Sequence, residues 1–329
     1  MSWLTSKVRS FTSYRRQRAL LKRTLATGIN PYAAAVAVGS PEIYSYEDPV
    51  DCTTLNYPDD TKSGGAGKLR SCLCTRDQME SPAFRYWTAR LGEHWRLHRK
   101  LWEHCIILQA LYERDLLRPG RSGLGFAVGE EALPSLMASL GCRIVATDLD
   151  SSDARADVWA KTAQLASNLE NLNNRRLCEP DVFRELVSFR PVDMNQIPDD
   201  LQGFDFTWSS CSFEHCGSLD LGKRFLSEQM KCLKPGGIAV HTTEFNLSSI
   251  DKTIESGTTV IFRKRDIEDM IRELQAQGHE VEKLQLHLGS TPEDAFVDTP
   301  PYSHELHLKL ELFGQYVSTS VVLIIKKSA

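Results

Sequence analysis

The sequence contains no run of about 18 apolar residues, the length that a membrane-spanning helix needs. Its start lacks an apolar stretch after the basic residues, so we expect no secretory signal peptide. The nine cysteines are odd in number and include no Cys-x-x-Cys pair, which disfavours both a zinc knuckle and a disulfide framework. These absences predict reduced thiols in a cytoplasmic protein.

Motifs that would identify other classes of protein are also missing. The glycine-rich residues 63–68 lack the Gly-x-x-x-x-Gly-Lys-Ser/Thr spacing of a phosphate loop, and no apolar strand precedes them. His94 and His98 lie one helical turn apart, but no His-Glu-x-x-His pattern accompanies them, so we expect no metal. The net charge of −4 argues against a dedicated nucleic-acid-binding protein.

The first 40 residues contain no acidic side chain but seven basic ones, with a few apolar residues scattered among them. This segment has two interpretations. A basic helix on an anionic surface would give peripheral membrane contact, whereas a solvated leader would give none. Residues 41–75 are rich in Pro, Asp, Thr and Gly and are predicted to form a loop. We therefore treat residues 1–76 as a basic leader and loop-rich segment.

Residues 77–119 are predicted to be helical. Their apolar side chains recur every three or four positions: Phe84, Trp87, Leu91 and Trp95, then Leu101, Cys105, Leu108 and Tyr112. Pro119 and Gly120 end the pattern, because proline cannot continue a helix and glycine permits the turn that follows. We expect this segment to form a helical extension, or lid, ahead of the main domain.

Short apolar strands alternate with amphipathic helices throughout residues 120–329. The predicted strands are 123–127, 142–147, 186–192, 204–209, 238–243, 281–288 and 320–326. The predicted helices are 133–140, 154–174, 219–233 and a face around 267–274. This alternation predicts an α/β fold with a doubly wound, mostly parallel, seven-stranded Rossmann-like sheet. An insertion, residues 289–318, separates the last two strands.

In such a sheet, ligands bind beyond the carboxyl ends of the strands, near the reversal of strand order. After the first strand, Gly125, Ala127 and Gly129 allow a tight turn whose N–H groups can approach a ligand. Asp148 ends the second strand, 19 residues after Gly129, where an acid can accept hydrogen bonds from both ribose hydroxyls of an adenosine. These two signals fit an NAD-dependent oxidoreductase as well as a methyltransferase.

Three later segments separate these two classes of enzyme. Asp193-Met194 follows the third strand, a strand beginning Phe-Asp runs into Glu-His within residues 204–215, and Leu-Lys-Pro-Gly-Gly at residues 233–237 leads into the fifth strand. In their order and spacing, the motifs across residues 120–288 resemble the class I S-adenosylmethionine-dependent methyltransferases. The resemblance implies that the chain binds S-adenosylmethionine.

The resemblance also implies a cofactor contact for each matching position. The turn from Gly125 through Ala127 to Gly129 would cradle the methionine portion of the cofactor. The other implied contacts are Asp148 with the ribose, Leu149, Asp193 and Met194 with the adenine, and Ser209 and Ser210 with the methionine end. Two features depart from the family, because Ala127 replaces its middle glycine and residues 121–125 contain no acid.

Methyl transfer to a hydroxyl is helped by a base, and a histidine with a pKa near neutrality suits that task. The candidates near the ends of the fourth and fifth strands are His215, Glu244 and His241. Glu244 is better placed than His241, because it lies nearer the carboxyl end of its strand. Structural roles are the alternative, with His215 at the start of a helix and His241 packed within a strand.

Two segments beside this edge are expected to bind the acceptor: the helical extension, with His98 and Trp102, and the insertion, with Tyr302 and His304. We expect O-methylation of a small-molecule or saccharide-like acceptor. The saccharide part rests on a loose resemblance to methyltransferases found with surface-glycan enzymes. The alternatives are N-methylation of a small molecule, an NAD-dependent oxidoreductase and a non-catalytic cofactor-binding scaffold. The sequence leaves the oligomeric state open.

Overall fold

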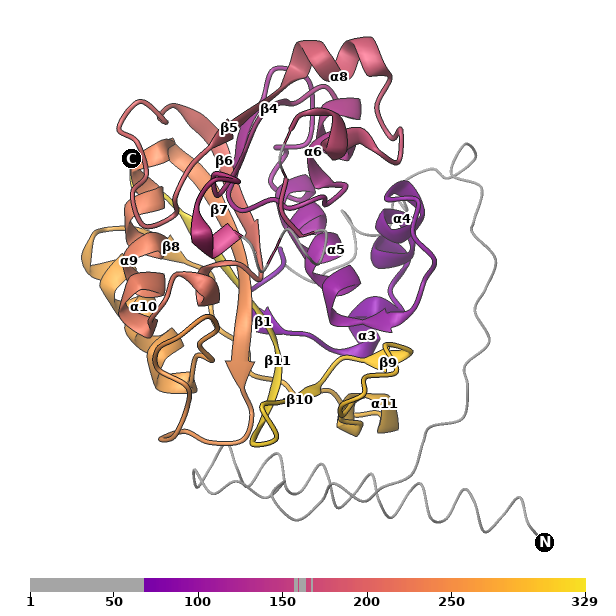
Figure 1. The fold of residues 1–329 in the computed structure, drawn as a ribbon, viewed down its shortest axis with the longest axis vertical. Coiled ribbons are helices and arrows are strands. Elements are labelled where there is room, and N and C mark those ends of the chain that lie inside the picture. The colour runs from indigo at the N-terminus through magenta and orange to yellow at the C-terminus, as the bar shows by residue number, and fades with distance from the viewer. Residues whose placement is uncertain (1–67, 157–158, 160–163, 167) are drawn as a thin grey trace, which may run out of the picture.

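In the part of the chain that the structure describes, nine strands form one mixed sheet (Figure 1). This computed structural model describes residues 68–156, 159, 164–166 and 168–329. Seven strands follow the order β1-β11-β7-β6-β3-β4-β5, and β8 and β10 also pair with β11. The strands are β1 (Cys72–Leu73), β3 (Ser122–Gly125), β4 (Arg143–Asp148), β5 (Val187–Pro191), β6 (Phe204–Ser210), β7 (Leu233–Asn246), β8 (Glu280–Val281), β10 (Leu310–Leu312) and β11 (Tyr316–Lys326).

The strand order locates the switch point of the sheet. Strands β3 to β7 pair in parallel, whereas β11 runs antiparallel to β7. The chain enters at the central strand β3, builds outward to β5 and returns to β6 on the other side of β3. This is the doubly wound, mostly parallel α/β sheet that the sequence predicts. The reversal between β3 and β6 places the expected ligand site at the carboxyl ends of these strands.

Helices cover both faces of the sheet (Figure 1). Their bounds are α3 (Arg76–Met79), α4 (Pro82–Arg90), α5 (Arg99–Tyr112), α6 (Leu133–Ser139), α8 (Pro180–Leu186), α9 (Leu219–Glu228), α10 (Lys264–Ala276) and α11 (Pro292–Ala295). One apolar core joins α4, α5 and α6 to one face of the sheet, and a second core joins α9 and α10 to the other. Helix α10 buries Ile267, Met270 and Leu274 at the spacing of a single helical face.

The predicted helical segment 77–119 consists of three separate helices, α3, α4 and α5. Ser81 caps the start of helix α4, because its hydroxyl accepts the Phe84 N–H at 3.4 Å, and Pro82 takes the first helical position. After α4, Gly92 has a φ of 63°, a left-handed conformation that ends the helix. Helix α5 then packs almost entirely buried against β6, β7 and β11.

The single continuous helix predicted for residues 154–174 is not observed, although Trp159 within it is helical. Short 3-10 helices occupy Ala154–Ala156 and Glu170–Asn173, and residues 164–166 are irregular. Asparagine side chains provide the reason, because they bind main-chain groups that a helix would use. The Asn168 side chain accepts the Asn171 N–H at 3.1 Å, and that of Asn173 binds the Cys178 N–H and C=O.

Other boundaries also differ from expectation. The strand predicted at 281–288 is reduced to β8, and β1 forms within the predicted loop 41–75 by pairing Cys72 with Val322 of β11. The basic leader, residues 1–40, lies outside the described residues. In the insertion, β9 (Leu306–His307) pairs in parallel with β2 (Leu97–His98) and so joins it to the start of α5. None of the helices in the described ranges is long and apolar enough to cross a membrane.

Candidate functional site

The turn after β3 is a tight turn that contains left-handed backbone. Ala127 and Gly129 both adopt left-handed backbone, with φ of 47° and 54°. The N–H of Phe126 donates to Trp208 C=O at 2.9 Å, and that of Val128 donates to Thr147 C=O at 3.0 Å. The N–H groups of Ala127 and Glu130 have no partner among the described residues. These two groups are therefore available to a bound cofactor.

Packing against a neighbouring strand leaves no room for a side chain at Gly125. A Cβ atom at this position would lie 2.3 Å from the ring of Trp208, on the neighbouring strand β6. At Gly129, a Cβ would lie 2.9 Å from the carbonyl oxygen of Gln164. Both glycines thus let other parts of the chain approach the turn closely, and neither contact is with an open cofactor pocket.

Asp148 lies at the end of β4 with most of its hydrogen-bonding capacity in use. One carboxylate oxygen accepts the N–H groups of Gly129 and Ala166, both at 2.9 Å, and the other accepts the N–H of Leu149 at 2.8 Å. Burial raises the pKa of Asp148 to about 6. Because a carboxylate accepts about four hydrogen bonds, one position remains for a ribose hydroxyl. A second hydroxyl requires the Ala166 N–H to give way.

The residues expected to border the adenine lie beside this carboxylate, at the ends of β4 and β5. Leu149 is half-buried and directly follows Asp148. Asp193 accepts the N–H of Asn195 at 2.9 Å and pairs with Arg155 at 2.8 Å, so it bridges the segments after the two strands. Met194 packs against the apolar core on the α9 face. Together with the turn after β3, these residues gather at the carboxyl ends of β4 and β5, where the sequence predicts the adenosyl group.

Ser209 and Ser210 point to opposite faces of β6, as neighbours on a strand do. Ser209 is fully buried, and its hydroxyl lies 2.8 Å from Nδ1 of His241. His241 has no exposed surface and lies edge-on against the Phe225 ring, and burial lowers its pKa to about 3. These two residues, expected at the cofactor and the base position, belong instead to the core under α9.

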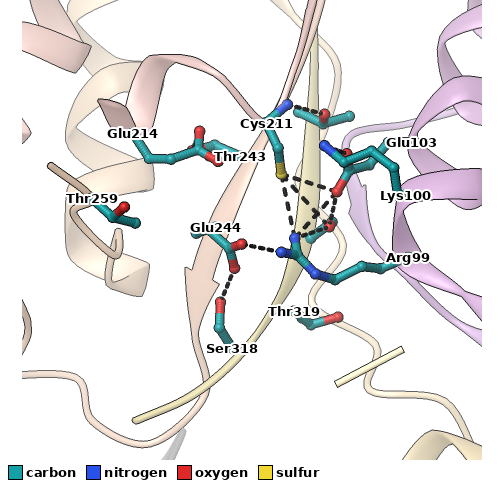
Figure 2. Close-up of polar contacts among 12 residues, drawn as sticks. Arg99, Lys100, Glu103, Cys211, Glu214, Thr243, Glu244, Thr259, Ser318 and Thr319 are labelled. Atoms are coloured by element: carbon teal, nitrogen blue, oxygen red, sulfur yellow. Dashed lines mark hydrogen bonds and ion pairs between the residues drawn. The ribbon is translucent and has the colours of Figure 1, made fainter. Parts of the chain in front are cut away.

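Ser210 faces a group of charged side chains that the sequence did not predict, apart from Glu244. We call Arg99, Lys100, Glu103, Glu214 and Glu244 the charged cluster; Figure 2 shows them between α5 and the ends of β6, β7 and β11. Glu103 is fully buried, 2.8 Å from Lys100 Nζ and 3.3 Å from Arg99. Arg99 also pairs with Glu244, so one guanidinium joins α5 to β7.

Hydroxyl and thiol groups complete the bonding of Glu103. Its carboxylate accepts from Ser210 at 3.1 Å, from the thiol of Cys211 at 2.9 Å and from Ser320 of β11. Burial acts to raise the pKa of Glu103, but Lys100 and Arg99 outweigh it and lower that pKa. Burial raises the pKa of Cys211 well above its ordinary value, so its sulfur stays a thiol. The cysteine is therefore a hydrogen-bond donor here and a poor nucleophile.

Glu214 and Glu244 form a pair of carboxyl groups at the edge of this cluster. Glu214 follows β6 and accepts the Thr243 hydroxyl at 2.8 Å, while Glu244 accepts from Ser318 as well as pairing with Arg99. Burial, and next the charge of Glu244, raise the pKa of Glu214 to about 8. At neutral pH, Glu214 therefore holds a proton while Glu244 faces the guanidinium.

His215 presents a free ring nitrogen at the end of β6. Its Nδ1 lies 2.8 Å from the carbonyl oxygen of Thr258, which can only accept, so Nδ1 carries the proton and Nε2 keeps its lone pair. Burial lowers the pKa of His215 to about 4, so the ring is neutral at physiological pH. Nε2 lies 4.0 Å from Glu214, and the ring lies 4.3 Å from that of Trp159, measured between centroids.

The structure brings three of the four expected acceptor residues together and adds one. The β2–β9 pairing sets His98 opposite His307, with ring centroids 4.7 Å apart, and the His304 ring lies 4.8 Å from that of His307. Tyr302 packs edge-on against His307. Trp102, the fourth, is instead fully buried, and its Nε1 donates to Gln78. His307 was missed, although its alternation with leucines at residues 306–310 indicates a strand.

Residues 124–241 match the methyltransferase domain family. Similar solved structures include the 1,6-didemethyltoxoflavin-N1-methyltransferase from Burkholderia thailandensis, with bound 1,6-didemethyltoxoflavin and S-adenosylhomocysteine. It is 14% identical, covers 67% of this chain and 76% of its own, and has a TM-score of 0.39. A putative sarcosine dimethylglycine methyltransferase from Galdieria sulphuraria is 17% identical, with coverages of 70% and 84% and a TM-score of 0.42.

A TehB-like methyltransferase from Corynebacterium glutamicum is 16% identical, covers 77% of this chain and 99% of its own, and has a TM-score of 0.38. No curated protein sequence matches the chain. The domain match spans β3 to the middle of β7, and therefore includes the turn at residues 125–129, Asp148 and His215.

Proposed function

We propose that this chain, whose residues 124–241 match the methyltransferase domain family, is a class I S-adenosylmethionine-dependent methyltransferase that methylates a hydroxyl oxygen of a small, saccharide-like acceptor. The cofactor supplies a methyl group that its sulfonium already activates. The protein must align the acceptor oxygen with the S–CH₃ bond and keep water away. Orientation of this kind can lower a barrier by roughly 7–11 kcal/mol.

The observation that carries the proposal is the free Nε2 lone pair of His215 at the carboxyl end of β6. An acceptor hydroxyl that receives the methyl group would become cationic at its oxygen, and its proton would then be strongly acidic. A base with a pKa of about 4 is then sufficient to take that proton. We assign this role to His215, whose ring is held in one tautomer by the carbonyl of Thr258.

Glu244, which the sequence suggested as a base, is assigned a positioning role instead. Its carboxylate already pairs with Arg99 and accepts from Ser318, so a substrate proton would have to compete with a cation. We assign Glu244 to positioning, because it fixes Arg99 between α5 and β7. The buried donors and acceptors of the charged cluster favour a polar acceptor, and His98, Tyr302 and His304 provide the neighbouring wall. This wall joins the helical extension to the insertion.

An acceptor screen tests the substrate class. The full chain is incubated with S-adenosylmethionine carrying a labelled methyl group and with panels of monosaccharides, phenols and small amines. We expect label in a methyl ether of a polyhydroxylated compound. Transfer to amines alone would contradict the hydroxyl acceptor and support the N-methyltransferase alternative. Cofactor binding without transfer to any panel would support the scaffold alternative.

Substitution of His215 tests the base. We expect His215→Ala and His215→Gln to lower turnover by about 10²- to 10⁴-fold while the Kd for S-adenosylmethionine stays nearly unchanged. Glutamine is included because its amide can still donate to the Thr258 carbonyl. His279→Ala is the matched control, since His279 contacts Ser328 near the carboxyl terminus. Equal loss of turnover and of cofactor affinity would contradict the base role.

A further inference from the structure

We propose that His98, His304 and His307, which we call the histidine triad, bind a divalent transition metal of the zinc class. One ring nitrogen from each residue lies within 4.8 Å of the others. The sequence gives no such signal, because His98 is separated from the other two by about 200 residues of chain. The parallel pairing of β2 with β9 sets His98 opposite His307. Imidazole nitrogen is a preferred ligand of zinc, copper and nickel.

The spacing of the three rings matches a tetrahedral ion. With a metal–nitrogen distance near 2.0–2.1 Å, the centroids of two ligating imidazoles lie about 5 Å apart. The observed centroid distances are 4.7 Å for His98 with His307, 4.8 Å for His304 with His307, and 5.8 Å for His98 with His304. His98 is stacked on His304 and His307, at interplanar angles of 22° and 26°, so the side chains would have to rotate for the three lone pairs to meet on one ion.

A hydrogen bond with Asp298 fixes the tautomer of His307 that a metal ligand needs. The buried carboxylate of Asp298 lies 2.7 Å from Nδ1 of His307 and accepts the N–H groups of Ser303 and His304 at 3.2 and 3.1 Å. Because a carboxylate only accepts, Nδ1 of His307 carries the proton and Nε2 keeps its lone pair. The same carboxylate fixes the backbone of His304. Carboxylate–histidine pairs of this kind orient the ligands in metal sites.

His98 requires one rearrangement. Its Nδ1 now accepts the N–H of Lys100 at 3.1 Å, so a neutral ring carries its proton on Nε2. Metal binding at Nε2 moves that proton to Nδ1 and releases the Lys100 N–H, a first-turn helix group that water can satisfy. His304 is exposed and gives an ion a path from solvent.

A second group of potential ligands, Cys211, Glu214 and Glu244, also lies within 4.8 Å. Its atoms are already in use, because the Cys211 thiol donates to Glu103 and Glu244 pairs with Arg99. The histidine triad is therefore the better site. Three imidazoles leave a fourth position open, as catalytic zinc sites do.

Metal titration tests the site directly and needs neither cofactor nor acceptor, so its outcome is independent of the proposed function. The full chain is treated with a chelator and then titrated with Co²⁺, followed by its visible absorption, and with Zn²⁺, followed by calorimetry. We expect one ion per chain, with a Co²⁺ spectrum of tetrahedral type. The absence of a saturable, equimolar phase would overturn the proposal.

Variants then locate the ion. We expect His307→Ala and His98→Ala to weaken Zn²⁺ binding by more than about 100-fold and Asp298→Asn to weaken it by about 10- to 100-fold. The exposed His94→Ala is the matched control and should bind as the unmodified chain does. Thermal unfolding of each metal-free variant checks that it folds. A folded His98 or His307 variant that binds Zn²⁺ as tightly as the unmodified chain would overturn the proposal. So would a loss of Zn²⁺ binding that occurs only in Cys211→Ser.

Discussion

The carboxyl ends of the parallel strands form one edge of the sheet, and the two halves of this edge are built in different ways. On the β3–β4 side, main-chain N–H groups of the turn at residues 125–130 and one carboxylate, Asp148, lie close together along the chain. On the β6–β7 side, the charged cluster collects side chains from α5, from the end of β6 and from β7. The difference teaches that a local motif can specify the predicted cofactor side, whereas the proposed acceptor side depends on distant segments that meet only after folding.

The largest expected effect on stability comes from removing a buried charge from the charged cluster on the β6–β7 side. Glu103→Ala leaves the largely buried Arg99, the part-exposed Lys100 and the Ser210, Cys211 and Ser320 donors without their common partner, so we expect a loss of about 3–5 kcal/mol in the free energy of unfolding. Denaturant titration measures it. Glu268→Ala, which breaks the half-exposed pair with Lys264, is the control and should cost at most about 0.5 kcal/mol. If Glu103→Ala and Glu268→Ala lost similar amounts of stability, the buried charge of Glu103 would not be what stabilises the β6–β7 side.

The acceptor side should also respond to pH in a direction set by Glu214. Its pKa is raised to about 8 by burial and by Glu244, so the folded state holds this proton more tightly than the unfolded state. The resulting stability is complete below the ordinary glutamate pKa and is lost as pH rises through about 8. We expect Tm to fall between pH 6 and 9 in the unmodified chain more than in Glu214→Gln. Parallel Tm profiles would contradict this account of Glu214.

The cofactor side should respond to pH in the opposite sense. Asp148 accepts hydrogen bonds as a carboxylate, and burial raises its pKa to about 6. Protonation removes an acceptor for the ribose, so affinity for S-adenosylmethionine should fall as pH drops through 6, by about tenfold between pH 7 and 5. Calorimetry at both pH values measures the change. Asp148→Asn should bind S-adenosylmethionine weakly, with little dependence on pH. If the affinity of this variant fell as steeply with pH as that of the unmodified chain, another group would be responsible for the titration.

The smallest expected effect concerns His241. The structure buries this residue between Ser209 and Phe225, away from the charged cluster. His241→Phe should therefore leave turnover nearly unchanged and alter the free energy of unfolding by less than about 1.5 kcal/mol. Steady-state kinetics and denaturant titration check the two parts. A loss of turnover as large as that of His215→Ala would restore His241 as a base.

The sequence predicted the parts that depend on neighbouring residues. The turn at Gly125–Gly129 and Asp148 could be found because strand ends and small residues lie along a short stretch of chain. The acceptor side could not, because Arg99 and Glu103 on a helix give no sign that they will meet Glu244 on β7. His307 was missed for the same reason. The predicted helix 154–174 failed where asparagine side chains bind the backbone locally, an effect that apolar periodicity does not record.

Titration calorimetry with S-adenosylmethionine, S-adenosylhomocysteine and NAD tests the central claim most directly, with Asp148→Ala beside the unmodified chain. We expect both adenosyl sulfur compounds to bind with micromolar Kd, NAD not to bind, and the substitution to weaken binding by at least about tenfold through the lost acceptor. Binding of NAD alone, or of none of the three, would contradict the assignment of this edge to S-adenosylmethionine.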